Sequence, residues 1–390
     1  MIICFVCDVL GRKNNGTTIA AMNLIESLRK KGHTVRVVCP DESRRGEKDY
    51  YIVPKLYVGP FKGYVEKNGV AIARSDDEVL RQALDGADHL HVLLPFFLGI
   101  HAMRLAKKAG LPVTASFHCQ AENLTSHMFL KNSKLANQET YKLFYHNFYQ
   151  YVDAIHYPSE FIRDTFEHYV GKTNGYVISN GVGSEFVPQQ VERPKELEEK
   201  RAILFTGRFS KEKSHTLLID AVRLSRHKDE IQLVFAGDGP LKAKLEAYSS
   251  DLPNPPIFGF FSRQELLRVI NSCDLYVHPA EIEIEAIACL EAISCGLVPV
   301  INNSPRSATR YFALDEKNLF ACNDVADLAE KMDYWLEHPE EKAVRSKEYL
   351  GYTKQFDFAL CMDRMEQMIL ETHAKVSQRG NHGKENDLLQ

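Results

Sequence analysis

The 390-residue sequence lacks an apolar run long enough to cross a membrane. Its longest uncharged apolar stretch, residues 89–103, is interrupted by Pro95 and Gly99, and it falls short of the roughly 20 residues that a spanning helix needs. Met1 leads directly into an apolar segment, without the basic residues that open a secretory leader. We therefore expect neither a transmembrane helix nor a signal peptide.

Other common signatures are also missing. There are 48 Lys and Arg against 52 Asp and Glu, and this net charge of −4 gives no sign of a nucleic-acid partner. The nine cysteines are odd in number and scattered, so we expect reduced thiols and a cytoplasmic protein. No Gly-x-Gly-x-x-Gly follows the first apolar segment, which disfavours a dehydrogenase.

The charge is divided unevenly along the chain. Residues 1–190 carry 22 Lys and Arg and 19 Asp and Glu, a net charge of 22 − 19 = +3. Residues 191–390 carry 26 and 33, a net charge of 26 − 33 = −7. Halves of opposite sign fit two domains with different surroundings, although chance accounts for the difference equally well.

Short apolar runs alternate with amphipathic helical patterns, which is typical of parallel sheets with crossover helices. The runs predicted as strands are residues 2–9, 34–39, 89–94, 113–117, 154–157, 203–206, 231–236, 275–278 and 298–301. We therefore predict an α/β protein with two Rossmann-like, doubly wound domains facing across a cleft, and a ligand site at the carboxyl ends of the strands. The predicted segments are a first domain over 1–188, a second domain over 189–355, a C-terminal helix over 356–377 and a flexible tail over 378–390.

The segment from His278 to Ile301 carries the most chemical information. It reads as a strand, an acidic loop, an apolar helix, a glycine and a second strand. Glu291 lies eight residues after Glu283, about two turns into the helix, where a carboxylate is unfavourable unless it accepts hydrogen bonds. Hydroxyl groups of a ribose or hexose would donate them, and the helix N-terminus would suit a phosphate. The alternative is an acidic helix N-terminus followed by one surface glutamate.

Together with further motifs, this Glu-x7-Glu segment resembles the retaining glycosyltransferases of family 4, the group 1 glycosyltransferases. That family has the GT-B fold, with two Rossmann-like domains and a last helix that crosses back to the first domain. The supporting motifs stand in the family's order, and the resemblance covers most of the chain. They are Asn15-Gly-Thr-Thr, Ser116-Phe-His118, Val177-Ile-Ser-Asn-Gly-Val, Leu204-Phe-Thr-Gly-Arg208 with Lys213, and Phe235-Ala-Gly-Asp-Gly-Pro240.

The resemblance implies a nucleotide-sugar donor bound mainly by the second domain. Arg208 and Lys213 would hold the diphosphate and neutralise the leaving group, so that neither a metal nor a cofactor is required. Glu291 would bind the nucleotide ribose, and Glu283 would position the donor sugar through its hydroxyls. His118 would face the sugar from the first domain, unless it is a structural histidine. The implied donor-binding residues are Gly16, Gly207, Arg208, Lys213, Glu283, Ile284, Glu285, Ala286, Ile287 and Glu291.

The chain departs from the family's pattern at two places. Glu285-Ala286 stands where the family usually has Phe-Gly, and an added carboxylate there leaves the identity of the donor sugar open. Gly183 stands where the family's "NGVD" stretch has Asp, and we expect this change to affect the hinge between the domains rather than the chemistry. No Asp-x-Asp occurs, so a metal-dependent single-domain glycosyltransferase has no support.

The acceptor is indicated only by residues 118–151, which combine lysines with many aromatic side chains in the positive half. Such a segment can lie among lipid headgroups, and it loosely resembles bacterial glycosyltransferases that act on membrane lipids such as diacylglycerol. The alternative is that the aromatic side chains pack a long helix against the first sheet.

These observations lead us to expect a retaining hexosyltransferase. It would move a sugar from a nucleotide-diphosphate donor resembling UDP-glucose to a sugar or to a membrane lipid such as diacylglycerol. The leaving phosphate would take the acceptor's proton, so we expect no protein base. We expect a cytoplasmic protein, peripheral on an anionic inner membrane face if the acceptor is a lipid. Alternatives are transfer to a polysaccharide or glycan precursor, a nucleotide-sugar epimerase of the same fold, and a non-catalytic sugar-binding protein.

Overall fold

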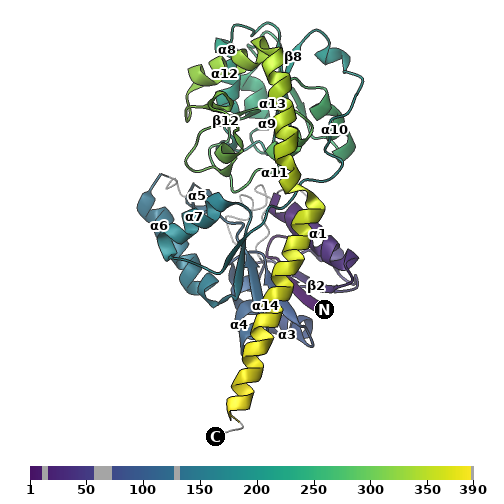
Figure 1. Cartoon of the computed structure of the whole chain (residues 1–390), viewed down its shortest axis with the longest axis vertical. Helices are drawn as coiled ribbons and strands as arrows, with labels where there is room; N and C mark the ends of the chain where they lie inside the picture. Colours follow the sequence, from purple (N-terminus) through teal and green to yellow (C-terminus); the bar gives the residue numbers. More distant parts are fainter. Residues whose placement is uncertain (11–15, 57–72, 127–131, 388–390) are drawn as a thin grey trace. The chain divides into compact units, whose positions relative to one another are not determined.

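The structure is a computed structural model that describes residues 1–10, 16–56, 73–126 and 132–387, with side chains as far as Arg379. The chain forms two compact units, and each is built around one parallel sheet (Figure 1). Unit 1 comprises Met1–Asn180 and Cys361–Gln390, and unit 2 comprises Gly181–Leu360.

In the described part of unit 1, the sheet has seven parallel strands in the order β3-β2-β1-β4-β5-β6-β7. Its strands are β1 Ile2–Val6, β2 Thr34–Cys39, β3 Tyr50–Ile52, β4 His89–Val92, β5 Val113–Ser116, β6 Ala154–Tyr157 and β7 Gly175–Val177. Its helices are α1 Gly16–Lys30, α3 Asp77–Leu84, α4 Phe97–Lys108, α5 Ala121–Ser126, α6 Lys134–Asn147, α7 Glu160–Val170 and most of α14 Phe358–Asp387.

The sheet of unit 2 has six parallel strands in the order β10-β9-β8-β11-β12-β13. Its strands are β8 Arg201–Thr206, β9 Ile231–Ala236, β10 Ile257–Gly259, β11 Leu275–His278, β12 Pro299–Asn302 and β13 Leu319–Phe320. Its helices are α8 His215–Leu224, α9 Lys242–Tyr248, α10 Arg263–Asn271, α11 Ile287–Ser294, α12 Val325–Glu337 and α13 Pro339–Tyr352. The strand order reverses between β8 and β11, and ligands of open α/β sheets bind at the carboxyl ends of the strands at such a point.

The strands of unit 2 form where apolar residues run almost continuously. β8 and β9 are buried on both faces, as expected for parallel strands that are covered by helices on each side. Leu204, Phe235 and Trp335 are fully buried in the core that these strands share with the helices. Burying each large apolar side chain contributes about 1.5–3 kcal/mol, so this core fixes the strand ends from which the candidate site is built.

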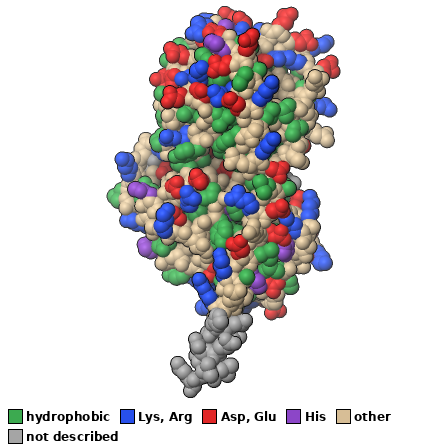
Figure 2. All heavy atoms as spheres, viewed as in Figure 1, with side chains coloured by type: hydrophobic (Ala, Val, Ile, Leu, Met, Phe, Trp, Pro, Cys, Tyr) green, Lys and Arg blue, Asp and Glu red, His purple; other side chains and the backbone are tan. Residues whose placement is uncertain are grey.

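The predicted fold class of two Rossmann-like α/β domains is confirmed, because each unit is a doubly wound parallel sheet. All nine cysteines are free thiols, as expected. No helix in the described part of the chain is long and apolar enough to span a membrane. On the face shown in Figure 2, acidic and basic side chains are interspersed over both units.

The boundary between the units differs from the predicted one. The sequence places it after residue 188, whereas the chain leaves unit 1 after Asn180. Residues 181–200 pack on unit 2, where Arg193 pairs with Asp274 at 2.6 Å. The prolines and charges over residues 187–200 predict an interdomain linker, but Val182, Phe186 and Leu197 are buried in the core of unit 2 and hold the segment on that unit.

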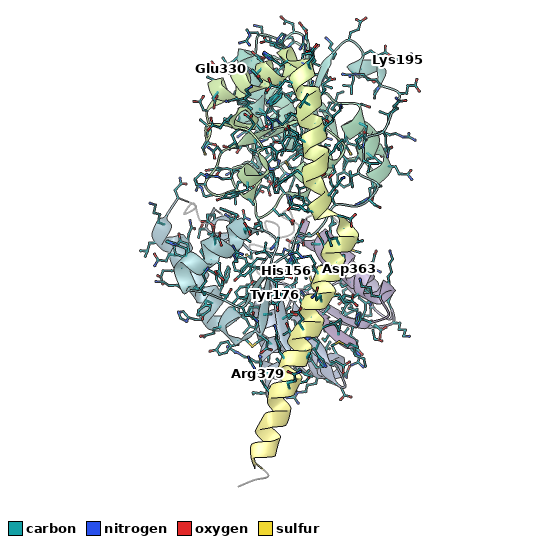
Figure 3. The ribbon with its side chains drawn as sticks, in the orientation of Figure 1. His156, Tyr176, Lys195, Glu330, Asp363 and Arg379 are labelled. Atoms are coloured by element: carbon teal, nitrogen blue, oxygen red, sulfur yellow. The ribbon has the colours of Figure 1, made fainter. Side chains whose placement is uncertain are left out.

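The C-terminal helix α14 begins in unit 2 and enters unit 1 at Cys361. In Figure 1 it runs alongside the sheet of unit 1, and Figure 3 labels Asp363 and Arg379 along it. Arg364 donates to the Val177 carbonyl at 2.9 Å, and the Tyr176 hydroxyl donates to Glu371 at 3.1 Å. Polar contacts with the last strand thus attach the helix to unit 1.

The polar tail, expected to be flexible from residue 378, is helical as far as Asp387. A helix that has already formed gains one hydrogen bond for each residue added, and residues 378–387 contain no proline to stop it. The helix α14 thus continues through residues where the sequence predicts a flexible tail, while residues 388–390 lie outside the described part.

Candidate active site

The loops after β8 and β11 carry most of the predicted donor-binding residues. Gly207 and Arg208 follow β8 directly. The backbone of this loop packs on two glycines, because a Cβ at Gly237 would lie 1.9 Å from the Gly207 carbonyl oxygen and one at Gly239 would lie 2.6 Å from that of Phe209. Only glycine fits at these two positions, and the close packing fixes the loop that presents Arg208 at the carboxyl edge of the sheet.

Lys213 and Glu283, 70 residues apart in the sequence, form an ion pair. Lys213 ends the short 3-10 turn η5, Lys211–Lys213, and Glu283 lies in the loop after β11. Their side chains are only 18% and 12% exposed. Burial would raise the pKa of Glu283, but Lys213 and His278 outweigh that effect and hold the pKa at about 2. The carboxylate is therefore ionised at neutral pH.

His278, to which the sequence motifs assign no role, supports Glu283 from inside the unit. It ends β11 and is 1% exposed. Its Nε2 lies 3.2 Å from Glu283 Oε1 without the alignment of a hydrogen bond, and its Nδ1 lies 3.2 Å from the Tyr276 hydroxyl. Tyr276 and His278 are two residues apart on one strand and so share a face, which is the one signal in the sequence that could have linked them.

The described contacts of the Glu283 side chain involve only one of its two carboxylate oxygens, Oε1. Lys213 and His278 both approach Oε1, and the side chain has no further partner among the described residues. Oε2 is therefore an ionised acceptor without a donor, and a hydroxyl group of a bound sugar would supply one.

Glu291 lies in α11 and is partly buried. Burial raises its pKa to about 7, while Arg263 lowers it and Glu185 raises it further. A carboxyl group that titrates near neutrality is more typical of functional sites than of a solvated surface. The partly buried position argues against the alternative of a plain surface glutamate.

Gly183, expected to affect only the hinge, instead bears on Glu291. Glu185 and Arg263 form an ion pair against Gly183, where a Cβ would lie 2.3 Å from Glu185 Oε2 and 2.5 Å from an Arg263 nitrogen. Any larger residue would displace this pair, whose charges act on Glu291. The glycine therefore belongs to the surroundings of the candidate site.

The Glu285-Ala286 departure strains the backbone. Ala286 precedes α11 and has a φ of 64°, a left-handed conformation that costs a non-glycine residue roughly 1–2 kcal/mol. Glycine would adopt it freely, which explains the glycine of the family's pattern. Glu285 is 5% exposed, whereas Ile284 and Ile287 are partly buried around the N-terminus of α11, which has no side-chain cap.

Two predicted residues belong to unit 1. Gly16 begins α1, and the preceding Asn15 lies outside the described residues. His118 follows β5, is partly buried, and has its ring centroid 5.7 Å from that of His156. Burial lowers the pKa of His118 to about 3, with a smaller effect from His156. The imidazole is therefore neutral and can exchange hydrogen bonds with a sugar without carrying charge.

His156, labelled in Figure 3, is the last side chain of a buried hydrogen-bond chain in unit 1. The chain runs through His89, Thr114, His91, Ser116 and His156 with contacts of 2.8–3.0 Å and ends at the Ile178 carbonyl. A carbonyl only accepts hydrogen bonds, so His156 donates through Nε2 and its Nδ1 accepts from the Ser116 hydroxyl. Ser116 in turn accepts from His91 Nε2. Thr114 donates to His91 Nδ1 and accepts from His89 Nε2. Burial lowers the pKa of all three histidines, so they form a neutral structural support beside His118.

The aromatic residues of segment 118–151 mostly pack inside unit 1. Tyr141 is 0% exposed and donates to Glu122 at 2.8 Å, and Tyr149 donates to the Ser116 carbonyl at 3.0 Å. The expectation that these aromatics lie among lipid headgroups is therefore wrong, because they form part of the core. The large apolar side chains of the described part of this segment that stay exposed are Leu135, Leu143 and Tyr151, and residues 127–131 lie outside it.

The residues of unit 2 together suit a phosphorylated sugar. Arg208 and Lys213 offer two cations for phosphate groups, Glu283 offers an ionised acceptor, and Glu291 offers a second carboxyl group. Among the described residues, no cluster of three or more His, Cys, Asp or Glu could hold a metal ion. The structure brings Lys213 and Glu283 together within unit 2, whereas Gly16 and His118 are in unit 1.

Two family models match consecutive parts of the chain. The model described as Glycosyltransferase Family 4 matches residues 14–186, and the model described as Glycosyl transferases group 1 matches residues 187–350. Together the matches extend from residue 14 to residue 350, and every predicted site residue lies within them.

Individual glycosyltransferases are also similar to this chain in sequence or in fold. The chain is 24% identical over 307 residues to alpha-monoglucosyldiacylglycerol synthase of Streptococcus pneumoniae, covering 75% of this chain and 68% of that protein. It is 26% identical over 351 residues to a GDP-mannose-dependent alpha-mannosyltransferase of Corynebacterium glutamicum, covering 85% and 79%. Among solved structures, sucrose-phosphate synthase of Thermosynechococcus elongatus shares the fold, with a TM-score of 0.72, 15% identity and coverage of 96% and 99%.

Proposed function

The chain belongs to the group 1 glycosyltransferases of family 4, and on that premise we propose that it is a retaining hexosyltransferase with a UDP-glucose-like donor. Arg208 and Lys213 hold the diphosphate, Glu291 binds the ribose, and Glu283 positions the sugar. The glucosyltransferase relative supports glucose as the sugar, and the mannosyltransferase relative makes GDP-mannose the donor to test against it.

The observation that carries this proposal is the Lys213–Glu283 pair at the switch point of unit 2. A cation suited to phosphate lies in contact with an ionised carboxylate whose second oxygen has no partner among the described residues. A nucleotide-sugar donor presents a diphosphate beside sugar hydroxyls, and this pair complements both parts. The sequence motifs also predict a sugar-binding role for His118, a neutral hydrogen-bonding group in unit 1.

The acceptor that we propose is the hydroxyl group of a membrane lipid such as diacylglycerol. The name of the Streptococcus pneumoniae relative supports this class of acceptor. The enzyme would act in the cytoplasm and contact the membrane peripherally. Because most aromatic side chains in the described part of segment 118–151 are buried, such contact would rest on exposed apolar side chains, such as Leu135 and Leu143 of α6 and Tyr151.

A screen of donors and acceptors tests the proposed function. Purified protein is incubated with UDP-glucose, UDP-galactose or GDP-mannose, and nucleotide release is followed with and without acceptors. The acceptors are diacylglycerol, in vesicles with and without anionic lipid, and soluble glycans. Release from UDP-glucose that a lipid hydroxyl accelerates is the expected result. Acceleration only by soluble glycans would move the acceptor to a glycan precursor.

We expect activity to survive chelation of metal ions. Arg208 and Lys213 supply the positive charge that a metal would otherwise bring to the leaving diphosphate. Turnover in EDTA is therefore expected to stay within about twofold of the untreated enzyme, measured as nucleotide release. Complete loss that a divalent cation reverses would contradict the metal-independent mechanism.

Nucleotide binding is expected to weaken as the pH falls below neutrality. The pKa of Glu291 is raised from 4.5 to about 7, so the carboxylate that would accept the ribose hydroxyls is lost by protonation between pH 8 and pH 6. If only the ionised form binds, the affinity should be about tenfold weaker at pH 6 than at pH 8. Calorimetry with UDP at several pH values measures this dependence.

The matched control is Glu291→Gln, because the amide does not titrate. In this variant the affinity for UDP should vary with pH only through the titration of the nucleotide phosphate. Glu291→Ala should weaken nucleotide binding at every pH. Unchanged affinity in Glu291→Ala would refute the ribose role.

A further inference from the structure

The loop after β11 is held by residues 302–308, which comprise the last residue of β12 and the segment that follows it. We call this segment the strap. Asn302 donates to the Pro279 carbonyl at 3.0 Å, and Ser304 donates to the Glu281 carbonyl at 2.7 Å. Both strap side chains are 0% exposed. Buried polar side chains are nearly always hydrogen-bonded. Here the side-chain amide of Asn302 and the hydroxyl of Ser304 both donate to backbone carbonyls of the neighbouring loop.

The strap continues the register of the two strands that precede it. β11 and β12 pair with a constant offset, as in His278 with Ile301 (301 − 278 = 23). The two side-chain bonds keep this offset (302 − 279 = 23 and 304 − 281 = 23). Backbone pairing then resumes at a parallel bridge between Glu283 and Ser307, with the offset one residue larger (307 − 283 = 24). Side chains of the strap therefore bridge a gap in the sheet ladder, and the ladder ends at Glu283.

Glu281 connects the strap to the turn that carries Lys213. Its N–H donates to the Glu212 carbonyl at 2.9 Å, one residue before Lys213, and its carboxylate pairs with Arg306 at 2.5 Å. The Ser304 hydroxyl holds the carbonyl of the same residue and also accepts from the Arg306 N–H at 3.2 Å. One buried hydroxyl thus helps to fix the spacing between two loops that meet at the candidate site.

We propose that Ser304 is a positioning residue for the donor site. By holding Glu281, its hydroxyl sets how the Glu283 carboxylate lies against Lys213 and how Glu283 Oε2 is presented to the donor sugar. This role rests on the proposed function, which assigns the sugar of the donor to Glu283. It concerns the sugar more than the nucleotide, because two of the three residues assigned to the nucleotide, Glu291 and Arg208, lie on other elements, and only Lys213 adjoins the contact of Glu281.

The substitution Ser304→Ala removes the hydroxyl and leaves the strap backbone in place. We expect the affinity for UDP, measured by calorimetry, to stay within about twofold of the wild type. Turnover of the nucleotide-sugar donor should fall about tenfold, the scale of one buried hydrogen bond. A selective loss of turnover with nucleotide binding retained is what distinguishes positioning of the sugar from general destabilisation.

The matched control is Ser249→Ala. Ser249 is 1% exposed and donates to the Leu245 carbonyl at 2.8 Å, at the C-terminal end of α9 in the same unit. The control loses the same kind of buried hydrogen bond outside the loops of the candidate site, so its turnover should stay close to wild type.

The turnover and the UDP affinity of the variants show whether Ser304 positions the site. Wild-type turnover in Ser304→Ala, or equal losses in Ser304→Ala and Ser249→Ala, overturns the role of Ser304. A fall in UDP affinity as large as the fall in turnover overturns it too. If thermal unfolding shows that Ser304→Ala does not fold, Ser304→Cys replaces it. An intermediate loss in the cysteine variant supports the role, and wild-type turnover overturns it.

The same experiment separates this role from the proposed function. A wild-type protein that releases no nucleotide from any nucleotide sugar overturns the proposed function, and the role of Ser304 with it. An active wild-type protein with an unaffected Ser304→Ala variant overturns the positioning role alone.

Discussion

Lys213→Ala is expected to lower the turnover of the nucleotide-sugar donor by about 10²-fold or more, the usual effect of removing one electrostatic donor from an active site. In the proposed mechanism the ammonium group neutralises the diphosphate as it leaves. In the unliganded protein it pairs with Glu283, whose side chain is only 12% exposed. Removing it also leaves that buried carboxylate without its cation, which disfavours the folded site. Nucleotide release at saturating donor measures the effect, and thermal unfolding reports any loss of stability.

Lys211→Ala is the matched control for Lys213→Ala. Lys211 begins the same 3-10 turn but is exposed to solvent. Both variants remove one lysine from the same turn, and they differ in the burial of that lysine and in the ion pair with Glu283. Turnover close to wild type in Lys213→Ala, or an equal loss in Lys211→Ala, would contradict the leaving-group role of Lys213.

Glu283→Gln is expected to lower donor turnover by about 10²-fold while the affinity for UDP stays within about twofold. The amide has the shape of the carboxylate, but it lacks the charge and replaces one acceptor oxygen with a donor group. Hydrogen bonds to charged groups contribute roughly 1.5–3 kcal/mol each, so loss of the bonds to sugar hydroxyls accounts for a change of this size. Nucleotide release and UDP calorimetry on the same preparation give the two quantities.

The control for Glu283→Gln is Glu337→Gln, which also removes one carboxylate of an ion pair in unit 2. Glu337 pairs with Arg226 at the surface, where such pairs contribute about 0–1 kcal/mol. Its turnover should match the wild type. If Glu283→Gln weakens UDP binding as much as it lowers turnover, Glu283 does not act on the sugar.

The sequence predicts the central strands of both sheets well and the edge strands poorly. β8, β9 and β11 are runs of apolar residues buried on both faces, and such runs are visible without a structure. The edge strands β3, β7, β10 and β13 are only two or three residues long. Segments so short have no periodicity of their own, so only their pairing with a neighbour defines them.

In the candidate site, the sequence predicts which residues take part but not how they contact one another. Motif order points to Arg208, Lys213, Glu283 and Glu291, but it does not predict which of them touch. The contact between Lys213 and Glu283 joins residues 70 positions apart, and it depends on how the loops after β8 and β11 meet at one sheet edge. Loop packing of this kind is a tertiary property that no local pattern encodes.

The supporting residues were harder still to predict. His278 and Ser304 are polar residues in or beside apolar strands, where a sequence alone cannot distinguish a buried hydrogen bond from solvent exposure. Their burial at 1% and 0% becomes apparent only when β11 and β12 are paired. The same holds for Gly183, whose lack of a side chain matters only because the Glu185–Arg263 pair lies against it.

The central claim is that the chain transfers a hexose from a nucleotide sugar with retention of configuration. It is tested most directly by following the reaction of UDP-α-glucose with a lipid acceptor by NMR, in the presence of EDTA. The account predicts that free UDP and an α-linked glycolipid appear together. A β-linked product, an epimerised sugar still attached to UDP, or no release of nucleotide from any nucleotide sugar would contradict it.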